Sequence, residues 1–116
     1  MTLIWVDAER EMPKVFTCYP ITTYHSTTVA NTNAIISICC KLDEDIYILL
    51  DYDAGKCATD GGDYIQILNF LEFKSHEDTS WKDYIKNKVT FHLHTADPVG
   101  RENMRRIIQK NSWREI

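Results

Sequence analysis

Glycine and proline are scarce in this sequence of 116 residues, which has 4 Gly and 3 Pro. So few of them exclude a collagen-like repeat, and no low-complexity linker is present. No apolar run approaches the roughly 18–20 residues that cross a bilayer, and no basic segment precedes the apolar residues 3–6 as it does in a signal peptide. The sequence therefore predicts a cytoplasmic globular protein without a membrane partner.

Paired cysteines are also missing. Cys18, Cys39, Cys40 and Cys57 lack the C-x-x-C spacing of zinc sites, and we expect them to be reduced. Positive charge is in deficit, because 13 Lys and Arg face 17 Asp and Glu and give a net charge of −4. An anionic partner such as RNA would need a local basic patch. The length fits a single domain over residues 1–116.

Three short apolar runs end in polar residues: Thr2–Val6, Ile46–Leu50 and Val89–His94. Continuous apolar runs of about five residues are typical of strands buried on both faces of a parallel sheet. Phe16–Ile21 is a possible fourth strand, and Pro20 within it indicates a sheet edge.

Helical patterns alternate with these runs. They cover Asn33–Leu42, Asp63–Phe73 and a short segment within residues 74–87, and a last helix has Asp97 as N-cap and Pro98 at its first position. Strands that alternate with helices predict an α/β fold with right-handed crossovers and a mostly parallel sheet of about four strands.

Polar residues follow the strands at their carboxyl ends, where ligands bind in open parallel sheets. The set expected at this edge is Asp7, Glu9, Asp51, Asp53, His94 and Thr95. Several carboxylates close together raise one another's pKa unless a cation such as Mg²⁺ neutralises them. The alternative is that these carboxylates cap helices and form ion pairs with Arg10 and Lys56.

His92 and His94 share one strand face, where two histidines can ligate a metal or act as acid and base on a phosphate. The alternative is a core histidine that a neighbouring carboxylate satisfies. His94 at the strand end fits the first interpretation better, whereas the deeper His92 fits a structural role.

The turn into the last helix is a candidate phosphate site, since a helix N-terminus offers free N–H groups. There Gly100 would allow close approach of a ligand, and Arg101 would add donors. Downstream basic residues form either a solvated helix face or a contact strip for RNA; they are Arg105, Arg106, Lys110 and Arg114.

Three segments, "IWVDAEREMP", "ILLDYDAG…GGDYIQIL" and "FHLHTADPVGRENMRRII", together resemble the cyclic-phosphate processing receiver domains in the order of their motifs. The resemblance covers nearly the whole chain and is most specific over residues 92–104. It implies a flavodoxin-like, receiver-like three-layer sandwich without a clear fifth strand or its lysine. It also implies a role in RNA-end repair, by recognition or processing of 2′,3′-cyclic phosphates.

The polar positions that match the family are Asp7, Glu9, Arg10, Asp51, Asp53, His92, His94, Thr95, Pro98, Gly100 and Arg101. Three positions depart from its pattern. Ala8 replaces the second aspartate of the first strand, which weakens a metal site, Tyr52 replaces a histidine, and Asp97 replaces an asparagine.

Two hypotheses follow. In the first, the protein is a metal-assisted phosphoesterase that acts on cyclic or terminal RNA phosphates with Mg²⁺ or Mn²⁺. The roles expected there are catalysis by Asp51, Asp53, His94 and Thr95; metal binding by Asp7, Glu9 and Asp51; phosphate binding by Arg10, Thr95, Gly100 and Arg101; and support by His92. In the second, it is a non-catalytic receiver-like module that binds a phosphorylated ligand or a partner protein, which Ala8 favours. The sequence leaves open whether the protein is an enzyme.

Overall fold

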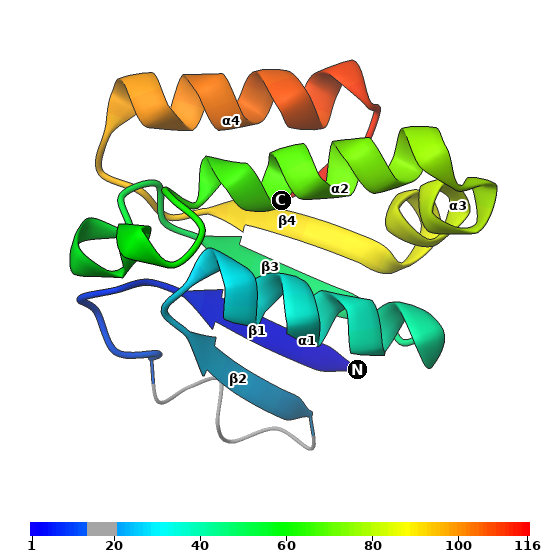
Figure 1. Ribbon diagram of the computed structural model, residues 1–116, viewed down its shortest axis with the longest axis horizontal. Helices are drawn as coiled ribbons and strands as arrows, with labels where there is room; N and C mark the ends of the chain where they lie inside the picture. Colours follow the sequence, from blue (N-terminus) through cyan, green and yellow to red (C-terminus); the bar gives the residue numbers. More distant parts are fainter. Residues whose placement is uncertain (14–20) are drawn as a thin grey trace.

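The computed structural model describes residues 1–13 and 21–116 and contains a five-stranded sheet in which every pairing is parallel (Figure 1). The strands are β1 (Thr2–Val6), β2 (Thr22–Ser26), β3 (Ile46–Leu50), β4 (Val89–Leu93) and β5 (Arg114–Glu115). Their order is β2-β1-β3-β4-β5. The helices are α1 (Val29–Lys41), α2 (Ile65–Glu77), α3 (Thr79–Lys88) and α4 (Pro98–Lys110), with a 3₁₀ turn η2 (Gly55–Thr59). This is the receiver-like, flavodoxin-like α/β fold that the sequence predicts.

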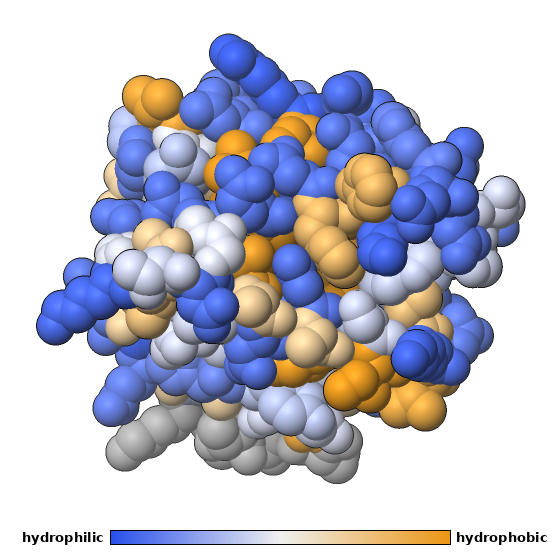
Figure 2. All heavy atoms as spheres, in the orientation of Figure 1, coloured by the Kyte–Doolittle hydropathy of each residue, from blue (hydrophilic) through white to orange (hydrophobic). Residues whose placement is uncertain are grey.

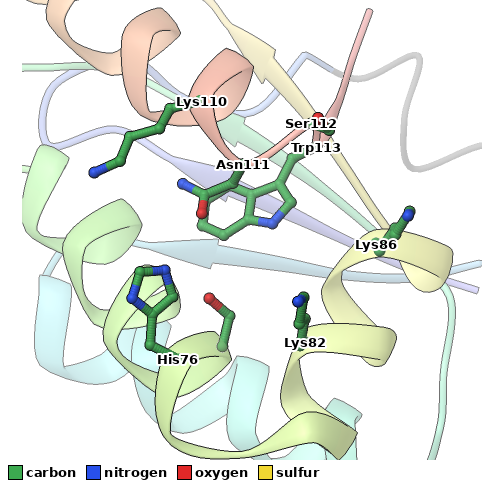
Figure 3. A pocket seen from close by; sticks show the side chains of 8 residues that line it. His76, Lys82, Lys86, Lys110, Asn111, Ser112 and Trp113 are labelled. Atoms are coloured by element: carbon green, nitrogen blue, oxygen red, sulfur yellow. The ribbon is translucent and has the colours of Figure 1, made fainter.

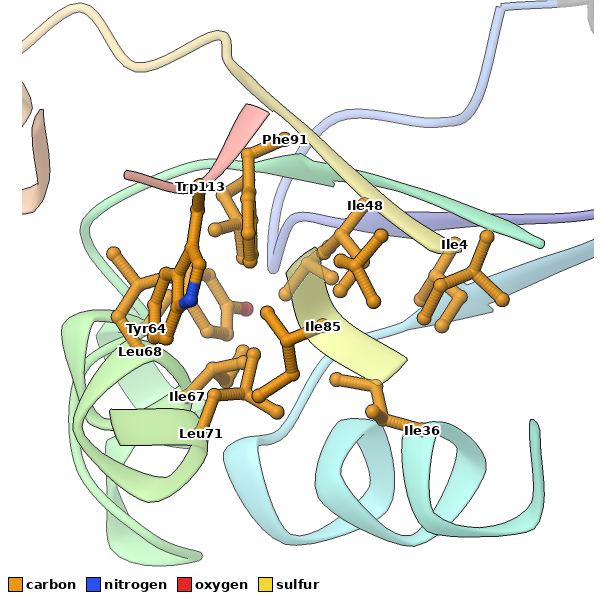
Figure 4. Close-up of a cluster of buried hydrophobic side chains, with 14 of the residues drawn as sticks. Ile4, Ile36, Ile48, Tyr64, Ile67, Leu68, Leu71, Ile85, Phe91 and Trp113 are labelled. Atoms are coloured by element: carbon orange, nitrogen blue, oxygen red, sulfur yellow. The ribbon is translucent and has the colours of Figure 1, made fainter. Parts of the chain in front are cut away.

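All four helices pack on one face of the sheet. The steps from β2 to β3, β3 to β4 and β4 to β5 run in one direction across the sheet, so right-handed crossovers place their helices on the same side. Strand residues such as Ile4, Ile48 and Phe91 meet helix residues such as Ile67 and Ile85 in the main core (Figure 4). The main core therefore lies between the sheet and one layer of helices.

The opposite face carries a smaller cluster of Leu3, Trp5 and Leu49, against which Met12 and Ile21 pack. Only the step from β1 to β2 runs in the other direction across the sheet. No helix of the described residues covers that face, so the second helical layer of the expected three-layer sandwich is not found there.

Several sequence predictions match the elements closely. β1 and β3 have the predicted bounds, and α4 begins at Pro98 with the Asp97 side chain as its cap. The short helix expected within residues 74–87 is α3. α1 starts four residues before the predicted Asn33, because the Thr28 side chain caps the helix by accepting a hydrogen bond from Asn31 N.

Two strands were not predicted. The edge strand β2 is polar and mostly exposed, and β5 has only two residues, so neither shows an apolar run. The predicted strand Phe16–Ile21 falls outside the described residues except for Ile21, and Cys18 lies outside them as well. The expected absence of a fifth strand was wrong, since β5 pairs with β4.

The helical face is largely hydrophilic, with apolar patches between charged side chains (Figure 2). Large hydrophobic residues exposed on the helices include Ile38, Leu42 at the end of α1, and Phe73. Within the described part of the chain, no helix has the length and apolar character that a bilayer span requires.

Candidate functional site

Asp7, Asp51 and His94 each follow a strand directly, and β1, β3 and β4 are neighbours in the sheet. The hydrogen-bond ladder continues to these residues, since Asp51 N donates to Val6 O (3.0 Å) and His94 N to Leu50 O (2.9 Å). The three side chains therefore meet at the carboxyl edge of the sheet, as expected from parallel strands that end in register.

A cavity of about 410 Å³ opens at this edge, which we call the rim cavity. Its lining consists of Asp7, Glu9, Arg10, Asp51, Asp53, Thr95, Ala96 and Asp97. Five carboxylates thus face one guanidinium, and a bare anion that enters the cavity meets a net negative field.

The Asp7 carboxylate is fully buried and saturated with donors. Its Oδ1 accepts hydrogen bonds from the backbone N–H groups of Glu9 and Arg10, both at 2.9 Å. Its Oδ2 accepts from Arg10 Nε at 2.8 Å and from His94 Nε2 at 3.2 Å. Burial opposes ionisation, but the hydrogen bonds from the Arg10 and Glu9 amides and from the guanidinium outweigh it and lower the pKa of Asp7.

Arg10 links the three strand ends. Besides its contact with Asp7, its Nη2 donates to the backbone oxygen of His94 at 2.9 Å and lies 3.7 Å from Asp51 Oδ1. The side chain remains about half exposed, at 51%. Arg10 is thus a structural clamp that also presents positive charge to the rim cavity.

His94 is held away from the rim cavity. Its ring stacks flat on Trp5, with centroids 4.0 Å apart and an interplanar angle of 1°. Because the Asp7 carboxylate only accepts, Nε2 carries the proton, and the buried Nδ1 has no hydrogen-bond partner among the described residues. Burial, with the charge of Arg10, lowers the pKa of His94. A general-acid role for His94 stays a prediction that its surroundings do not support.

Sequence reasoning missed Trp5 as the platform for His94. Trp5 lies two residues before Asp7, so both residues belong to the same face of β1. Its Nε1 donates to Arg10 O at 2.9 Å, which fixes the ring beneath the turn that follows the strand. The spacing of two residues between Trp5 and Asp7 is the sequence signal that could have placed Trp5 beside the site.

Asp51 and Asp53 remain open toward the cavity. Asp51 is 16% exposed, and its Oδ1 accepts from Tyr52 N at 2.8 Å, whereas no described residue donates a hydrogen bond to its Oδ2. Asp53 is exposed and accepts from Gly55 N at 2.8 Å, and Glu9 is also exposed. Together these side chains leave carboxylate oxygens free for a ligand.

The donor set fits a divalent cation in part. Asp7 does not fit, because its oxygens are already occupied by protein donors, and Ala8 supplies no ligand. In the residues that the structure describes, no three His, Cys, Asp or Glu side chains are grouped to hold a metal. Mg²⁺, however, is commonly bound by one or two carboxylates together with water and phosphate oxygens, and Asp51 and Glu9 have that chemistry.

The N-terminus of α4 does not offer the free N–H groups that a phosphate-binding site was expected to have there. The Asp97 carboxylate accepts from Val99 N (3.0 Å) and Gly100 N (3.1 Å), and Pro98 has no N–H. A Cβ on Gly100 would lie 2.4 Å from Cγ of Tyr52, so this glycine makes room for the Tyr52 ring and not for a ligand.

Arg101, Thr95 and His92 differ in their access to the cavity. Arg101 donates through Nη2 to Thr95 O, and its Nε is buried without a described partner, so it holds the turn before α4. Thr95 lines the cavity, its Oγ1 accepts from Asp97 N at 3.2 Å, and no described residue accepts a hydrogen bond from its O–H. His92 lies one level deeper, with Nδ1 3.1 Å from Ile116 O, away from the rim.

Each of the two interpretations of the acidic residues, cation binding and capping with ion pairing, therefore applies to some of them. Capping and ion pairing account for Asp7, which binds Arg10, and for Asp97, which caps α4. They do not account for the open oxygens of Glu9, Asp51 and Asp53.

Comparison with known proteins points the same way as the motifs. The family model described as cyclic-phosphate processing receiver domain matches residues 2–110. No curated protein and no solved structure matches the chain.

Proposed function

The chain belongs to the cyclic-phosphate processing receiver domains, and from this premise we propose that its rim cavity binds the cyclic or terminal phosphate of an RNA end together with a divalent cation. One observation carries the proposal: no described residue donates a hydrogen bond to Oδ2 of Asp51, which lines the same cavity as Arg10. Five carboxylates would repel a phosphate that arrives without a cation.

Donor residues of the cavity would bind the phosphate, and acidic residues would bind the cation. Arg10 and Thr95 both line the cavity, and their guanidinium and hydroxyl groups are the donors that would contact phosphoryl oxygens. Asp51 and Glu9 would hold Mg²⁺ or Mn²⁺. The bound cation would offset the negative charge of the phosphate and of the acidic wall.

We favour recognition over hydrolysis. General acid–base catalysis needs a proton donor within hydrogen-bond reach of the reacting group, and the two ring nitrogens of His94 are directed to Asp7 and into the protein interior. Phosphoester hydrolysis is the second candidate. Asp51 and Asp53, whose carboxylates are open to the cavity, favour it because either could act as a base.

Binding of uridine 2′,3′-cyclic phosphate in Mg²⁺, followed by calorimetry, tests the proposal. We expect saturable binding that Asp51→Asn weakens by about tenfold or more, because a hydrogen bond or ligand bond to a charged group is worth roughly 1.5–3 kcal/mol. The matched control is Asp83→Asn, which removes the same charge from an exposed position on α3.

The outcomes separate the two candidates. Binding without turnover in ³¹P spectra supports recognition, and release of a uridine monophosphate that Asp51→Asn abolishes supports the phosphoesterase. No binding in either Mg²⁺ or Mn²⁺, or equal losses in Asp51→Asn and Asp83→Asn, overturns the proposal.

A further inference from the structure

A second cavity lies at the other end of the helical layer, and its charge is opposite. It has a volume of about 340 Å³ and is bounded by the ends of α2 and α4 and by one side of α3 (Figure 3). Its lining includes three lysines and a histidine, namely Lys82, Lys86, Lys110 and His76, and contains no Asp or Glu. We call it the basal cavity.

We propose that the basal cavity binds a phosphate monoester, held chiefly by Lys82 and Lys86 with His76 beside them. In a chain with a net charge of −4, Lys82 and Lys86 bring two ammonium groups without a described carboxylate partner to one space, where they repel one another. A doubly charged anion between them would relieve that repulsion, and compact ammonium groups are common phosphate ligands.

Lys82 and Lys86, two of the three lysines of α3, lack the carboxylate partners that Lys74, Lys88 and Lys110 have. Lys74 pairs with Glu77 at 3.9 Å, and Lys110 with Glu72 at 3.4 Å. Lys82 and Lys86 form no ion pair with any described carboxylate, and they lie one helical turn apart on α3. Their charges are therefore available to a ligand.

The innermost residues that line the basal cavity are buried and packed against the core. Ser75 and Trp113 are 6% and 8% exposed, and Trp113 packs on Phe91 with ring centroids 5.5 Å apart. Asn111 donates to Glu72 and to Ile107 O, so Lys110 and Asn111 are held in place by contacts behind the cavity. The volume lies at the lower end of the range for small-molecule sites, which suits a phosphate on a small organic group.

Helix electrostatics offer the competing explanation. Lys86 and Lys110 lie in the last turns of α3 and α4, where positive side chains complement the helix dipole. Lys82 lies in the middle of α3 and is not explained in this way. A ligand role and a purely helical role differ in whether neutralising the lysines changes anion affinity.

The test is an NMR titration of the ¹⁵N-labelled full chain in EDTA, which removes free divalent cations from the rim cavity. The ligands are inorganic phosphate, uridine 3′-monophosphate and neutral uridine. We expect saturable shifts at His76, Lys82, Lys86 and the indole N–H of Trp113 with the two phosphate ligands, and none with uridine.

The variant Lys82→Gln/Lys86→Gln should weaken both phosphate affinities by at least about tenfold. The control Lys41→Gln/Lys56→Gln removes the same charge from exposed lysines outside the basal cavity and should leave affinity within about twofold. Both pairs are exposed, so the variants are expected to fold, and their ¹⁵N spectra show whether they do.

Three results would overturn the proposal: shifts that rise linearly without saturation, equal losses in the two double variants, or saturable shifts that map to the rim cavity. Equal binding of an RNA strand without a terminal phosphate would also contradict it, because the ligand would then be a phosphodiester and not a monoester.

Discussion

The rim cavity and the basal cavity have similar volumes, about 410 and 340 Å³, but opposite charge. Carboxylates gather at the rim because three neighbouring parallel strands end in Asp or turn into an Asp-capped helix. Lysines gather at the base because α2 and α4 run back from that edge and end there beside α3. The net charge of −4 for the whole chain matches the local charge of neither cavity. The charge of a ligand must therefore be inferred from the residues that line its own cavity.

The largest effect is expected at the rim. Asp7→Asn should lower the free energy of unfolding by about 2–3 kcal/mol, because an amide nitrogen would then face the donors Arg10 Nε and His94 Nε2. Urea denaturation measures this loss. A change below about 0.5 kcal/mol would contradict the role of Asp7 as the anchor of the rim.

The same variant carries a pH signature. The pKa of Asp7 is lower in the folded chain than its ordinary value of 3.8, so the folded state binds fewer protons and gains stability above that pH. This stability is lost as the pH falls below 3.8 toward the folded pKa. Asp7→Asn should remove that part of the acid dependence.

The packing between Tyr52 and Gly100 is the next test. Gly100→Ala should destabilise the fold by about 1–3 kcal/mol, because its Cβ would overlap the Tyr52 ring. Thermal unfolding measures the loss. Adding Tyr52→Ala should recover part of it, and strict additivity of the two changes would show that the ring and the glycine are not in conflict.

A smaller effect is expected from His94. Its pKa lies below 6.5 in the folded chain, so the unfolded state binds the proton first, and stability should fall as the pH drops below 6.5. The slope approaches about 1.4 kcal/mol per pH unit where only the unfolded imidazole is charged. His94→Phe keeps a ring on Trp5 and should remove this slope below pH 6.5. Equal slopes in both proteins would contradict the buried neutral imidazole.

The smallest effect is expected at the base. Lys82→Gln/Lys86→Gln should change the free energy of unfolding by less than about 0.5 kcal/mol, because both side chains are exposed and without carboxylate partners in the described chain. Urea denaturation at low salt is the measurement. A large loss of unfolding free energy would mean that these lysines stabilise the fold. It would contradict the difference expected between them and Asp7.

Periodicity and strand ends account for what the sequence could predict. The apolar runs of β1 and β3 and the Asp97–Pro98 start of α4 are local signals, and parallel strand ends must meet at one edge. The choice of partners at that edge was local only in part. The ion pair of Arg10 with Asp7 joins residues three apart and was one of the alternatives from the sequence. That the His94 ring stacks on Trp5, and that Tyr52 fills the space over Gly100, depends instead on side chains from different elements meeting in space.

The basal cavity could not be predicted from the sequence, because it too depends on distant elements meeting in space. Its residues come from three separate parts of the sequence: the end of α2 (75–76), Lys82 and Lys86 of α3, and the end of α4 with the turn that follows it (110–113). The basic C-terminal stretch was noticed, but Arg105 pairs with Glu115 and Arg106 lies 3.9 Å from Glu102, so much of its charge is engaged within the protein. Lys82 and Lys86 of α3, by contrast, have no carboxylate partner among the described residues.

The most direct test of the central claim is the coupling between cation and phosphate at the rim. Mg²⁺ affinity is measured by calorimetry with and without saturating uridine 2′,3′-cyclic phosphate. We expect the nucleotide to tighten Mg²⁺ binding by at least about fivefold, with the same factor in the reverse titration, since coupling free energies are reciprocal. Nucleotide binding of equal strength in Mg²⁺ and in EDTA would contradict a rim cavity whose carboxylates admit phosphate only with a cation.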